Sequence, residues 1–144
     1  MEQLIQQLKV ILGTNFILYF KSHSFHWNIE GPDFAQYHSF LNDFYDSVFD
    51  QTDDIAEHIR QLDAFAPTGV GRMLELSAIE ETDNIPSALG MLSQLKKDND
   101  DYIIQLRAGI VLADQAGEPA VSNFLQDLLG AHQKHGWMLR SFAR

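Results

Sequence analysis

Apolar residues recur along the first part of this chain at intervals of three and four positions, which places them on one side of an α-helix. The first such segment extends from near residue 2 to about Asn28, and its stripe is Ile5, Leu8, Leu12, Phe16, Tyr19 and His23. The second covers residues 34–62, with its stripe at Phe34, Tyr37, Leu41, Phe44, Val48, Ile55, Ile59 and Leu62, and with Thr52 in the one gap. The pattern predicts two long helices, with His23 near the buried edge of the first.

The same spacing returns in the second half of the chain. Pro86 suits the first turn of a third helix, whose stripe is Leu89, Leu92, Leu95, Tyr102, Leu106 and Ile110, interrupted by Asn99. Pro119 suits the first position of a fourth helix, whose stripe is Val121, Phe124, Leu125, Leu128, His132, His135 and Leu139. We expect the charged residues of the third helix to form a solvated face, namely Lys96, Lys97, Asp98, Asp100 and Asp101. No segment has the period of a strand.

The connections between these helices indicate how they are arranged. Residues 30–33 end the first helix and connect it to the second, with Asp33 as the expected N-cap of the second helix. The connection between the second and third helices, about 22 residues, is long for a bundle, and Met73–Ala78 is expected to form a short helix within it. One long crossover is typical of the ferritin-like topology. We therefore expect an all-α protein with one domain over residues 1–144, a four-helix bundle whose long crossover carries a short helix between helices 2 and 3.

Composition restricts the possible functions. The 144 residues are enough for a real core, and they include no cysteine, which excludes disulfides, thiolate metal ligands and cysteine nucleophiles. The first 13 residues, MEQLIQQLKVILG, lack a basic region and a cleavage site, so we expect a helix there and not a signal peptide. No apolar run approaches the roughly 18 residues of a membrane span. These features suit a cytoplasmic protein.

The net charge of −10 indicates which partners the surface favours. An acidic surface repels phosphate backbones and attracts cations. Together with histidines and carboxylates at regular spacing, it favours the movement of cations over binding of nucleic acid.

Five polar residues on or beside the second helix are the candidates for chemistry: His26, His38, Asn42, Asp53 and Glu57. Histidine nitrogen with carboxylate oxygen suits a divalent transition metal such as iron, with zinc as an alternative. Asp53 and Glu57 stack one helical turn apart. His38 and Asp53, however, are about 22 Å apart along one helix. Either the two ends do unrelated things, or a second, antiparallel copy brings its Asp53 to this copy's His38 across a two-fold contact.

The spacing of these residues resembles the signature of the Dps mini-ferritins. It consists of HWNIEG, a histidine twelve positions after the first, and D-x-x-x-E fifteen positions further on, and the segment KHGWMLRSF is similar to the last helix of that family. The resemblance implies a four-helix subunit, a hollow dodecamer, and oxidation of Fe²⁺ by hydrogen peroxide or O₂, with storage of ferric mineral. It also implies shared sites, with His26 and His38 from one subunit and Asp53 and Glu57 from its neighbour.

Asn42 departs from this signature, because the family usually has Asp four residues after the second histidine. A neutral amide compensates the charge of a cation less than a carboxylate does, which weakens a second iron position. The resemblance also places Glu118 and Asp127 in pores on the three-fold axes, although Asn123 stands where another acid is common. For these two residues, helix capping and ordinary surface charge explain the sequence equally well.

Two other functions compete with iron storage. A DNA-compacting protein of this family tends to carry a Lys/Arg-rich tail, which neither Met1–Gln3 nor Ser141–Arg144 provides, so we expect no direct DNA binding. A structural shell with a degenerate site, holding zinc or nothing, is the other alternative. A ferritin-type site within one bundle is disfavoured because no Glu-x-x-His pair occurs.

His132 and His135 have no carboxylate in their pattern and are expected to be structural. Trp27 is expected to pack, or to act as a redox-active neighbour of the metal site.

Overall fold

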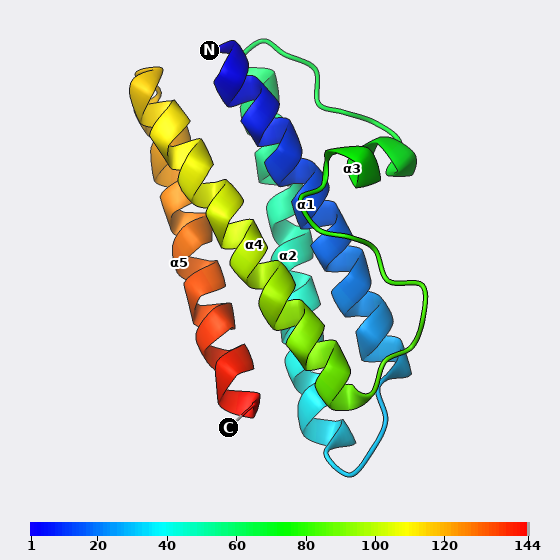
Figure 1. Cartoon of the computed structure of the whole chain (residues 1–144). Helices are drawn as coiled ribbons and strands as arrows, with labels where there is room; N and C mark the ends of the chain where they lie inside the picture. Colours follow the sequence, from blue (N-terminus) through cyan, green and yellow to red (C-terminus); the bar gives the residue numbers. More distant parts are fainter. Residues whose placement is uncertain (144) are drawn as a thin grey trace.

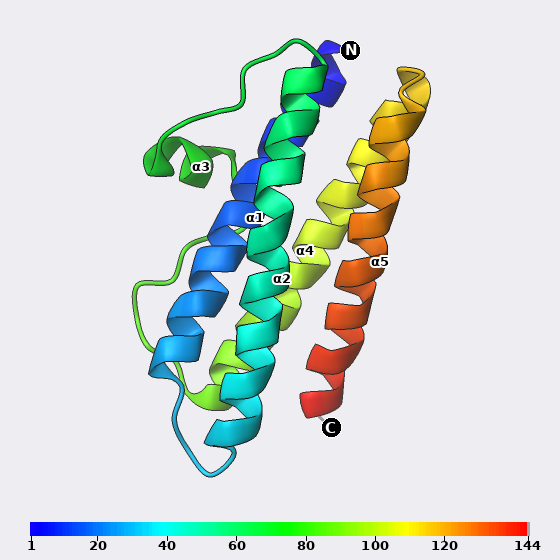
Figure 2. The same ribbon diagram turned by 180° about the vertical axis from the view of Figure 1, so that it is seen from behind.

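The computed structural model describes residues 1–143, which form four long helices and one short one (Figure 1). They are α1 Glu2–Asn28, α2 Phe34–Gln61, α3 Val70–Leu76, α4 Ala88–Gln115 and α5 Pro119–Phe142. The four long helices form an elongated bundle, and α3 lies on its outside, against α1 (Figures 1 and 2). The all-α fold with a short helix in the crossover between the second and third long helices is therefore confirmed.

Local sequence determines most of the helix boundaries. Pro119 is the first residue of α5, as predicted, and Asp33 is the N-cap residue of α2, although its side chain makes no capping hydrogen bond. The prediction for Pro86 was wrong. Ser87 is the N-cap of α4 and its Oγ accepts a hydrogen bond from the Gly90 N–H at 3.1 Å, so Pro86 lies before the helix. The short helix begins at Val70, three residues earlier than predicted, and ends at Leu76.

The position of α3 depends on close contact with α1. A Cβ atom at Gly13 would lie 2.6 Å from the carbonyl oxygen of Met73 and 2.9 Å from the Cβ atom of Leu76. Only glycine lets the backbones approach so closely at this point. The adjacent Thr14 Oγ1 also accepts a hydrogen bond from the Ala78 N–H at 2.9 Å, which ties the crossover to the bundle.

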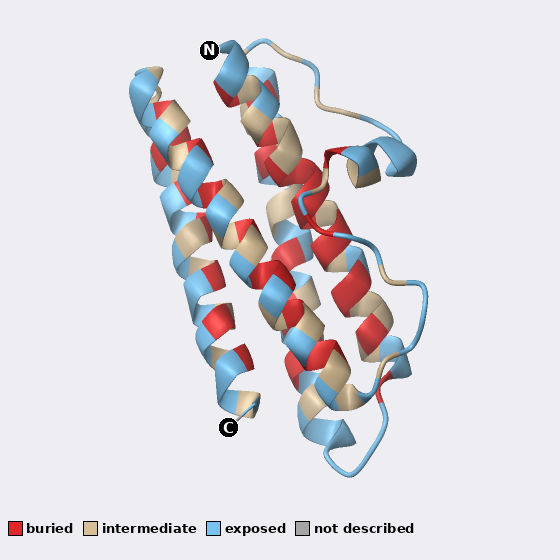
Figure 3. Cartoon of the chain, in the orientation of Figure 1, coloured by how far each residue is buried: buried red, intermediate tan, exposed pale blue. Residues whose placement is uncertain are grey.

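The core lies along the facing sides of the four long helices, where the buried positions cluster (Figure 3). On α2 the predicted stripe is confirmed at its centre, at Leu41, Phe44, Val48, Ile55 and Ile59. On α1 the predicted Leu8 and Leu12 are buried, but the rest of the buried line is shifted to Leu4, Ile11, Leu18 and Phe25, whereas Ile5, Phe16 and Tyr19 are only half-buried. The shift arises because α1 packs against α2, α3 and α4 together, so its apolar surface is broad.

The prediction of a solvated charged face on α4 was wrong for Asp98. This residue is buried and its Oδ2 accepts a hydrogen bond from Nζ of Lys21 on α1 at 2.7 Å. Burial raises the pKa of Asp98, and the hydrogen bond and charge of Lys21 oppose that rise. Lys96 and Lys97 do form exposed pairs with Asp100 and Asp101, one turn away. Within the described residues, none of the helices is long and apolar enough to cross a membrane.

Candidate functional site

His26 and His38 meet where α1 ends and α2 begins. Nδ1 of His26 lies 2.9 Å from the backbone carbonyl oxygen of His38, and Nδ1 of His38 lies 2.9 Å from that of His26. The two rings stack with their centroids 3.7 Å apart and an angle of 16° between their planes. The loop between the helices therefore closes on a reciprocal pair of hydrogen bonds between residues twelve positions apart.

These two hydrogen bonds determine the tautomer of both rings. A carbonyl oxygen only accepts, so each Nδ1 must carry the hydrogen and donate it. In a neutral imidazole the lone pair is then on Nε2, which is the usual arrangement of a metal-binding histidine whose other nitrogen donates to a carbonyl. Both side chains are half-buried, so the two Nε2 atoms are oriented in advance without being sealed in the core.

Three aromatic residues adjoin this pair on the bundle side. The Tyr45 ring lies 5.1 Å from the His26 ring and stacks on His23, with centroids 3.8 Å apart and an angle of 9°. The Tyr19 hydroxyl is 2.9 Å from Nδ1 of His23. Burial, and then the charge of His26, lowers the pKa of His23, whereas burial, and then Asp46, raises the pKa of Tyr45. The expectation that His23 is a hydrogen-bonded residue at the core edge is confirmed.

Asn42 lies one turn after His38 on α2, half-buried. Its Oδ1 accepts a hydrogen bond from the Tyr45 hydroxyl at 3.2 Å. The one side-chain atom of Asn42 that is suited to a hard cation therefore already has a partner within the chain.

The carboxylates of the candidate site gather near the other end of α2. Oxygen atoms of Asp53, Asp54 and Glu57 all lie within 4.8 Å of one another, and all three residues are exposed. Asp54 was not among the predicted site residues, although the spacing of three between Asp54 and Glu57 was a signal for it. In the part of the chain that the structure describes, these acids are not joined by a histidine. The single chain therefore holds two separate halves of the predicted ligand set.

The second pair of histidines lies inside the bundle. His132 is fully buried, with Nδ1 2.8 Å from Oδ1 of Asn99 and Nε2 3.1 Å from Oε1 of Gln51. Burial lowers the pKa of His132 to about 3, and burial followed by the charge of Lys134 lowers that of His135 to about 4. Both nitrogens of His132 are engaged within the chain, which supports the structural role expected for it.

Glu118 and Asp127 are not brought together by the fold. Glu118 is the N-cap residue of α5 but makes no capping hydrogen bond with its side chain, and Asp127 is exposed on the same helix. Nine positions separate them, about 13 Å along the helix axis. Any pore that uses both residues requires other copies of the chain.

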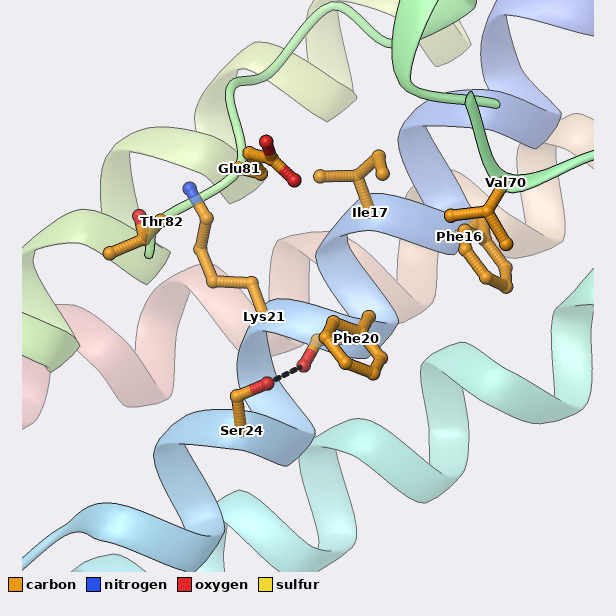
Figure 4. A pocket seen from close by; sticks show the side chains of 8 residues that line it. All are labelled: Phe16, Ile17, Phe20, Lys21, Ser24, Val70, Glu81 and Thr82. Atoms are coloured by element: carbon orange, nitrogen blue, oxygen red, sulfur yellow. Dashed lines mark hydrogen bonds between the residues drawn. The ribbon is translucent and has the colours of Figure 1, made fainter. Parts of the chain in front are cut away.

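A pocket of about 320 Å³ opens between α1 and the crossover, apart from the histidines and acids described above (Figure 4). Its apolar lining includes Phe16, Phe20 and Val70, and its polar side is formed by Lys21, Glu81 and Thr82. Phe20 and Val70 are 51% and 68% exposed, so this pocket belongs to an uncovered apolar surface. It has no set of ligands for chemistry.

Known proteins resemble this chain over almost its whole length. The family model of the ferritin-like domain matches residues 5–144. A DNA protection during starvation protein from Brevibacillus brevis is 30% identical over 147 residues, which cover 99% of each chain. Dps from Staphylococcus aureus has a solved structure with a TM-score of 0.96 and 25% identity, covering 100% of this chain and 97% of that one. The structure of antigen TpF1 from Treponema pallidum is 32% identical, with a TM-score of 0.93 over 98% and 91% of the two chains.

The likeness thus extends from the helix order to the short crossover helix, and it includes relatives at 30% identity or more. The chain belongs to the ferritin-like family and, within it, to the Dps proteins.

Proposed function

We propose that this chain is a ferroxidase subunit of an iron-storing Dps shell. Fe²⁺ is the substrate, and it binds at sites shared between two-fold-related copies, where hydrogen peroxide or O₂ oxidises it. The ferric product collects as mineral inside a hollow assembly of about twelve chains, which protects the cell against oxidative damage.

The reciprocal hydrogen bonds of His26 and His38 are the observation that carries this proposal. In the neutral form of each ring they hold the hydrogen on Nδ1 and leave the lone pair on Nε2. Two neutral nitrogens supply part of a ligand set for Fe²⁺, but anionic oxygen is needed to balance the charge. The exposed Asp53 and Glu57 supply that oxygen only from another copy, because about 22 Å of helix separates Asp53 from His38 in the same chain.

The face of α2 is suited to a two-fold contact. Positions 38, 42, 45, 49 and 53 succeed one another at intervals of four and three, so they lie on one side of the helix. If His38 of one copy meets Asp53 of an antiparallel copy, the two-fold axis crosses α2 midway, beside Asp46. Phe49 lies close to that point and is 54% exposed. An apolar ring between two polar ends is what a dimer contact would cover.

The uncovered apolar surface of α1 and α3 supports the same contact. Phe20 and Val70 adjoin the pocket of Figure 4, and Trp27, whose ring lies 6.2 Å from Phe20, is 58% exposed. Burial of apolar surface contributes about 25 cal/mol of free energy per Å², which would favour association through this side of the chain. The contact would also remove water from the metal site.

The chemistry follows from the ligand set. His26 and His38 bind Fe²⁺ through Nε2, while Asp53 and Glu57 of the neighbouring copy stabilise the higher charge of Fe³⁺. In the net reaction, two Fe²⁺ ions lose one electron each, and hydrogen peroxide takes up these two electrons and two protons to form two water molecules. Zn²⁺ prefers the same donors and would compete for the site. Glu118 and Asp127 would attract Fe²⁺ at pores between copies of α5.

Subunit mixing tests the shared site. One variant lacks both histidines (His26→Ala, His38→Ala) and the other lacks both acids (Asp53→Ala, Glu57→Ala). Each alone should fail to oxidise Fe²⁺. After refolding in equal amounts, about half of the dimers should be mixed, and one site in each mixed dimer is intact, so roughly a quarter of the wild-type activity should return.

The control is co-assembly of the two variants, shown by a tag on one of them and by light scattering. If co-assembly is proven and the activity stays at the background of the separate variants, the site is not shared and the proposal is wrong. A wild-type chain that remains monomeric or dimeric would remove the storage role.

The Brevibacillus relative is named for protection of DNA during starvation. Direct DNA binding is not proposed for this chain, because its net charge is −10 and an acidic surface repels phosphate. We expect no retardation of DNA near neutral pH at physiological salt without added divalent metal. A shift under those conditions would contradict this expectation.

A further inference from the structure

Tyr19, His23 and Tyr45 form a tyrosine–histidine cluster whose chemistry the proposed iron site does not use. Tyr19 and His23 lie one turn apart on α1, joined by a hydrogen bond of 2.9 Å between the phenol oxygen and Nδ1. The phenol is the stronger acid, so we assign it as the donor and His23 Nδ1 as the acceptor. Tyr45 comes from α2 and stacks on the His23 ring at 3.8 Å.

The cluster makes a continuous path to the metal-binding histidines. The rings of Tyr19 and Tyr45 are 6.3 Å apart, and the rings of Tyr45 and His26 are 5.1 Å apart. Electrons cross such short gaps between aromatic rings readily. Tyr45 is therefore placed to pass an electron from Tyr19 to the site held by His26.

A tyrosine gives up an electron easily only when its proton has an acceptor. The His23 Nδ1 atom provides one within the hydrogen bond that already exists. With Nδ1 as the acceptor of this bond, the hydrogen of the neutral ring is on Nε2, and the lone pair of Nδ1 points at the phenol. Because the proton remains on His23, it can return when the tyrosine is reduced. This is the arrangement of a reversible one-electron donor.

The need for such a donor follows from Asn42. A neutral amide replaces the usual carboxylate, and its Oδ1 is bonded to the Tyr45 hydroxyl at 3.2 Å. A site that holds one Fe²⁺ ion tightly provides one electron, but reduction of hydrogen peroxide to water takes two. With one electron alone, the peroxide would split into hydroxide and a hydroxyl radical.

We propose that the Tyr19–His23 pair stores the second oxidising equivalent during peroxide reduction, with Tyr45 as the relay between this pair and the iron site. The proposal rests on the proposed oxidation of Fe²⁺ and assigns a new role to residues outside the ligand set. It explains how a site with a weakened second iron position reduces peroxide fully.

The electrons and protons balance in two steps. In the first, one Fe²⁺ and Tyr19 each give one electron to hydrogen peroxide, which takes two protons from solvent and leaves as two water molecules. Fe³⁺ and a neutral tyrosyl radical remain, and the phenol proton stays on His23. In the second, another Fe²⁺ reduces the radical, the proton returns from His23 to Tyr19, and a second Fe³⁺ forms. Two Fe²⁺ ions are thus oxidised for each peroxide.

The test uses the assembled full-length protein, loaded with one Fe²⁺ per site under anaerobic conditions. The protein is then mixed with one equivalent of hydrogen peroxide, and the sample is frozen during the reaction. We expect an organic radical in the electron paramagnetic resonance spectrum, with a pattern that changes when the tyrosines carry ring deuterium. Addition of a second Fe²⁺ should discharge it. Tyr19→Phe should lose the radical and release trappable hydroxyl radical, while Fe³⁺ still forms.

Two further variants sharpen the result. His23→Phe keeps a ring against Tyr45 but removes the proton acceptor, and it should also lose the radical. Tyr37→Phe is the matched control, because Tyr37 packs on Phe142 with ring centroids 5.3 Å apart, outside the cluster, and it should leave the signal unchanged. The isotope experiment needs no variant, so it shows whether a tyrosine carries the radical even if one of these chains fails to assemble.

Each other outcome overturns the proposal in a distinguishable way. If wild-type protein oxidises Fe²⁺ with peroxide but shows no tyrosyl radical, or shows the same radical in Tyr19→Phe, the cluster is not the store while the ferroxidase role stands. A radical that responds only to deuterated tryptophan places the equivalent on a tryptophan instead. If the wild-type protein does not oxidise Fe²⁺ at all, the proposed function fails and this proposal with it.

Discussion

Two pairs of histidines in this protein differ in how the structure uses their nitrogens. His26 and His38 stack at the rim of the bundle, half-buried, and each gives only its Nδ1 to the chain. His132 and His135 meet inside the bundle with their rings 5.2 Å apart, and His132 has a partner on both nitrogens. The first pair is available to a ligand, and the second holds helices together.

A free ring nitrogen, more than the presence or spacing of histidines, therefore indicates a metal-binding role. A backbone carbonyl takes the N–H of His26 and of His38 and leaves a lone pair at Nε2. Around His132, side-chain amides from α2 and α4 contact both nitrogens, so neither nitrogen is free for an ion. Burial then adds a cost to any charge at that position.

Single alanine substitutions should have the largest effects, and these effects should differ between the two histidine pairs. We expect His38→Ala to abolish Fe²⁺ oxidation while changing the free energy of unfolding by less than about 1 kcal/mol, since one partly exposed hydrogen bond is lost. His132→Ala should lower that free energy by about 3 kcal/mol, because it leaves a cavity and unpaired amides.

Stopped-flow oxidation assays and urea unfolding of the same preparations measure both quantities. His132→Ala protein that remains assembled should retain most of its activity per site. Loss of activity in an assembled and folded His132→Ala shell would show that the inner pair also binds iron.

The pH dependence of stability should come mainly from the inner pair. The pKa of His132 is about 3 in the folded chain, below the unfolded value of about 6.5, so the unfolded state binds a proton first as the pH falls. Stability is therefore full above about pH 6.5 and is lost progressively below it. Between pH 7 and pH 5 we expect a loss of about 2 kcal/mol from this residue.

Urea unfolding across this pH range measures the loss in wild-type protein and in His132→Gln, which cannot be protonated. The variant should be less stable at pH 7 but should depend less on pH. Equal slopes for the two proteins would mean that other groups cause the acid sensitivity.

Much of this comparison could be predicted from the sequence, and the remainder could not for a physical reason. The periodicity of apolar residues predicted the extents of α1 and α2 and that His23 lies at the core edge, and Pro119 predicted the start of α5. The family signature pointed to His26 and His38 as metal ligands, which stays a prediction. The reciprocal hydrogen bonds between these two residues depend on how the loop at residues 29–33 closes, which spacing alone does not determine.

Contacts distant in sequence account for the errors. Asp98 was assigned to a solvated face because its neighbours are charged, but its partner Lys21 is 77 positions away on α1. Asn99 looked like an interruption of a stripe, whereas its Nδ2 donates to the backbone oxygen of His132 at 2.8 Å inside the core. A one-dimensional pattern records polarity but not the partner that makes burial of a polar group tolerable.

A moderate effect should follow from restoring a carboxylate beside the outer pair. Asn42→Asp adds a negative charge one turn from His38, and it keeps an oxygen that can accept the hydrogen bond from Tyr45. We expect a second Fe²⁺ per site to bind about tenfold more tightly, within the range seen for changes around metal ligands, and oxidation to be faster.

Metal titration and initial rates measure the two effects, and Asp43→Asn on the adjacent face of α2 serves as the control for net charge. If stoichiometry and rate in Asn42→Asp both remain at wild-type values, position 42 is not near the metal in the way the family signature implies.

The smallest effect concerns His135, the less constrained member of the inner pair. Its Nε2 lies 3.3 Å from the Ser47 hydroxyl, longer than the 2.8 Å contact between His132 and Asn99. Hydrogen bonds weaken with length, so Ser47→Ala should lower the free energy of unfolding by less than about 1 kcal/mol. Asn99→Ala, which removes two short contacts with His132, should cost clearly more. Urea unfolding at pH 7 compares the two variants. Equal losses of unfolding free energy would show that both inner histidines are held with the same strength. The inner pair would then hold α2 to α5 as firmly as it holds α4 to α5.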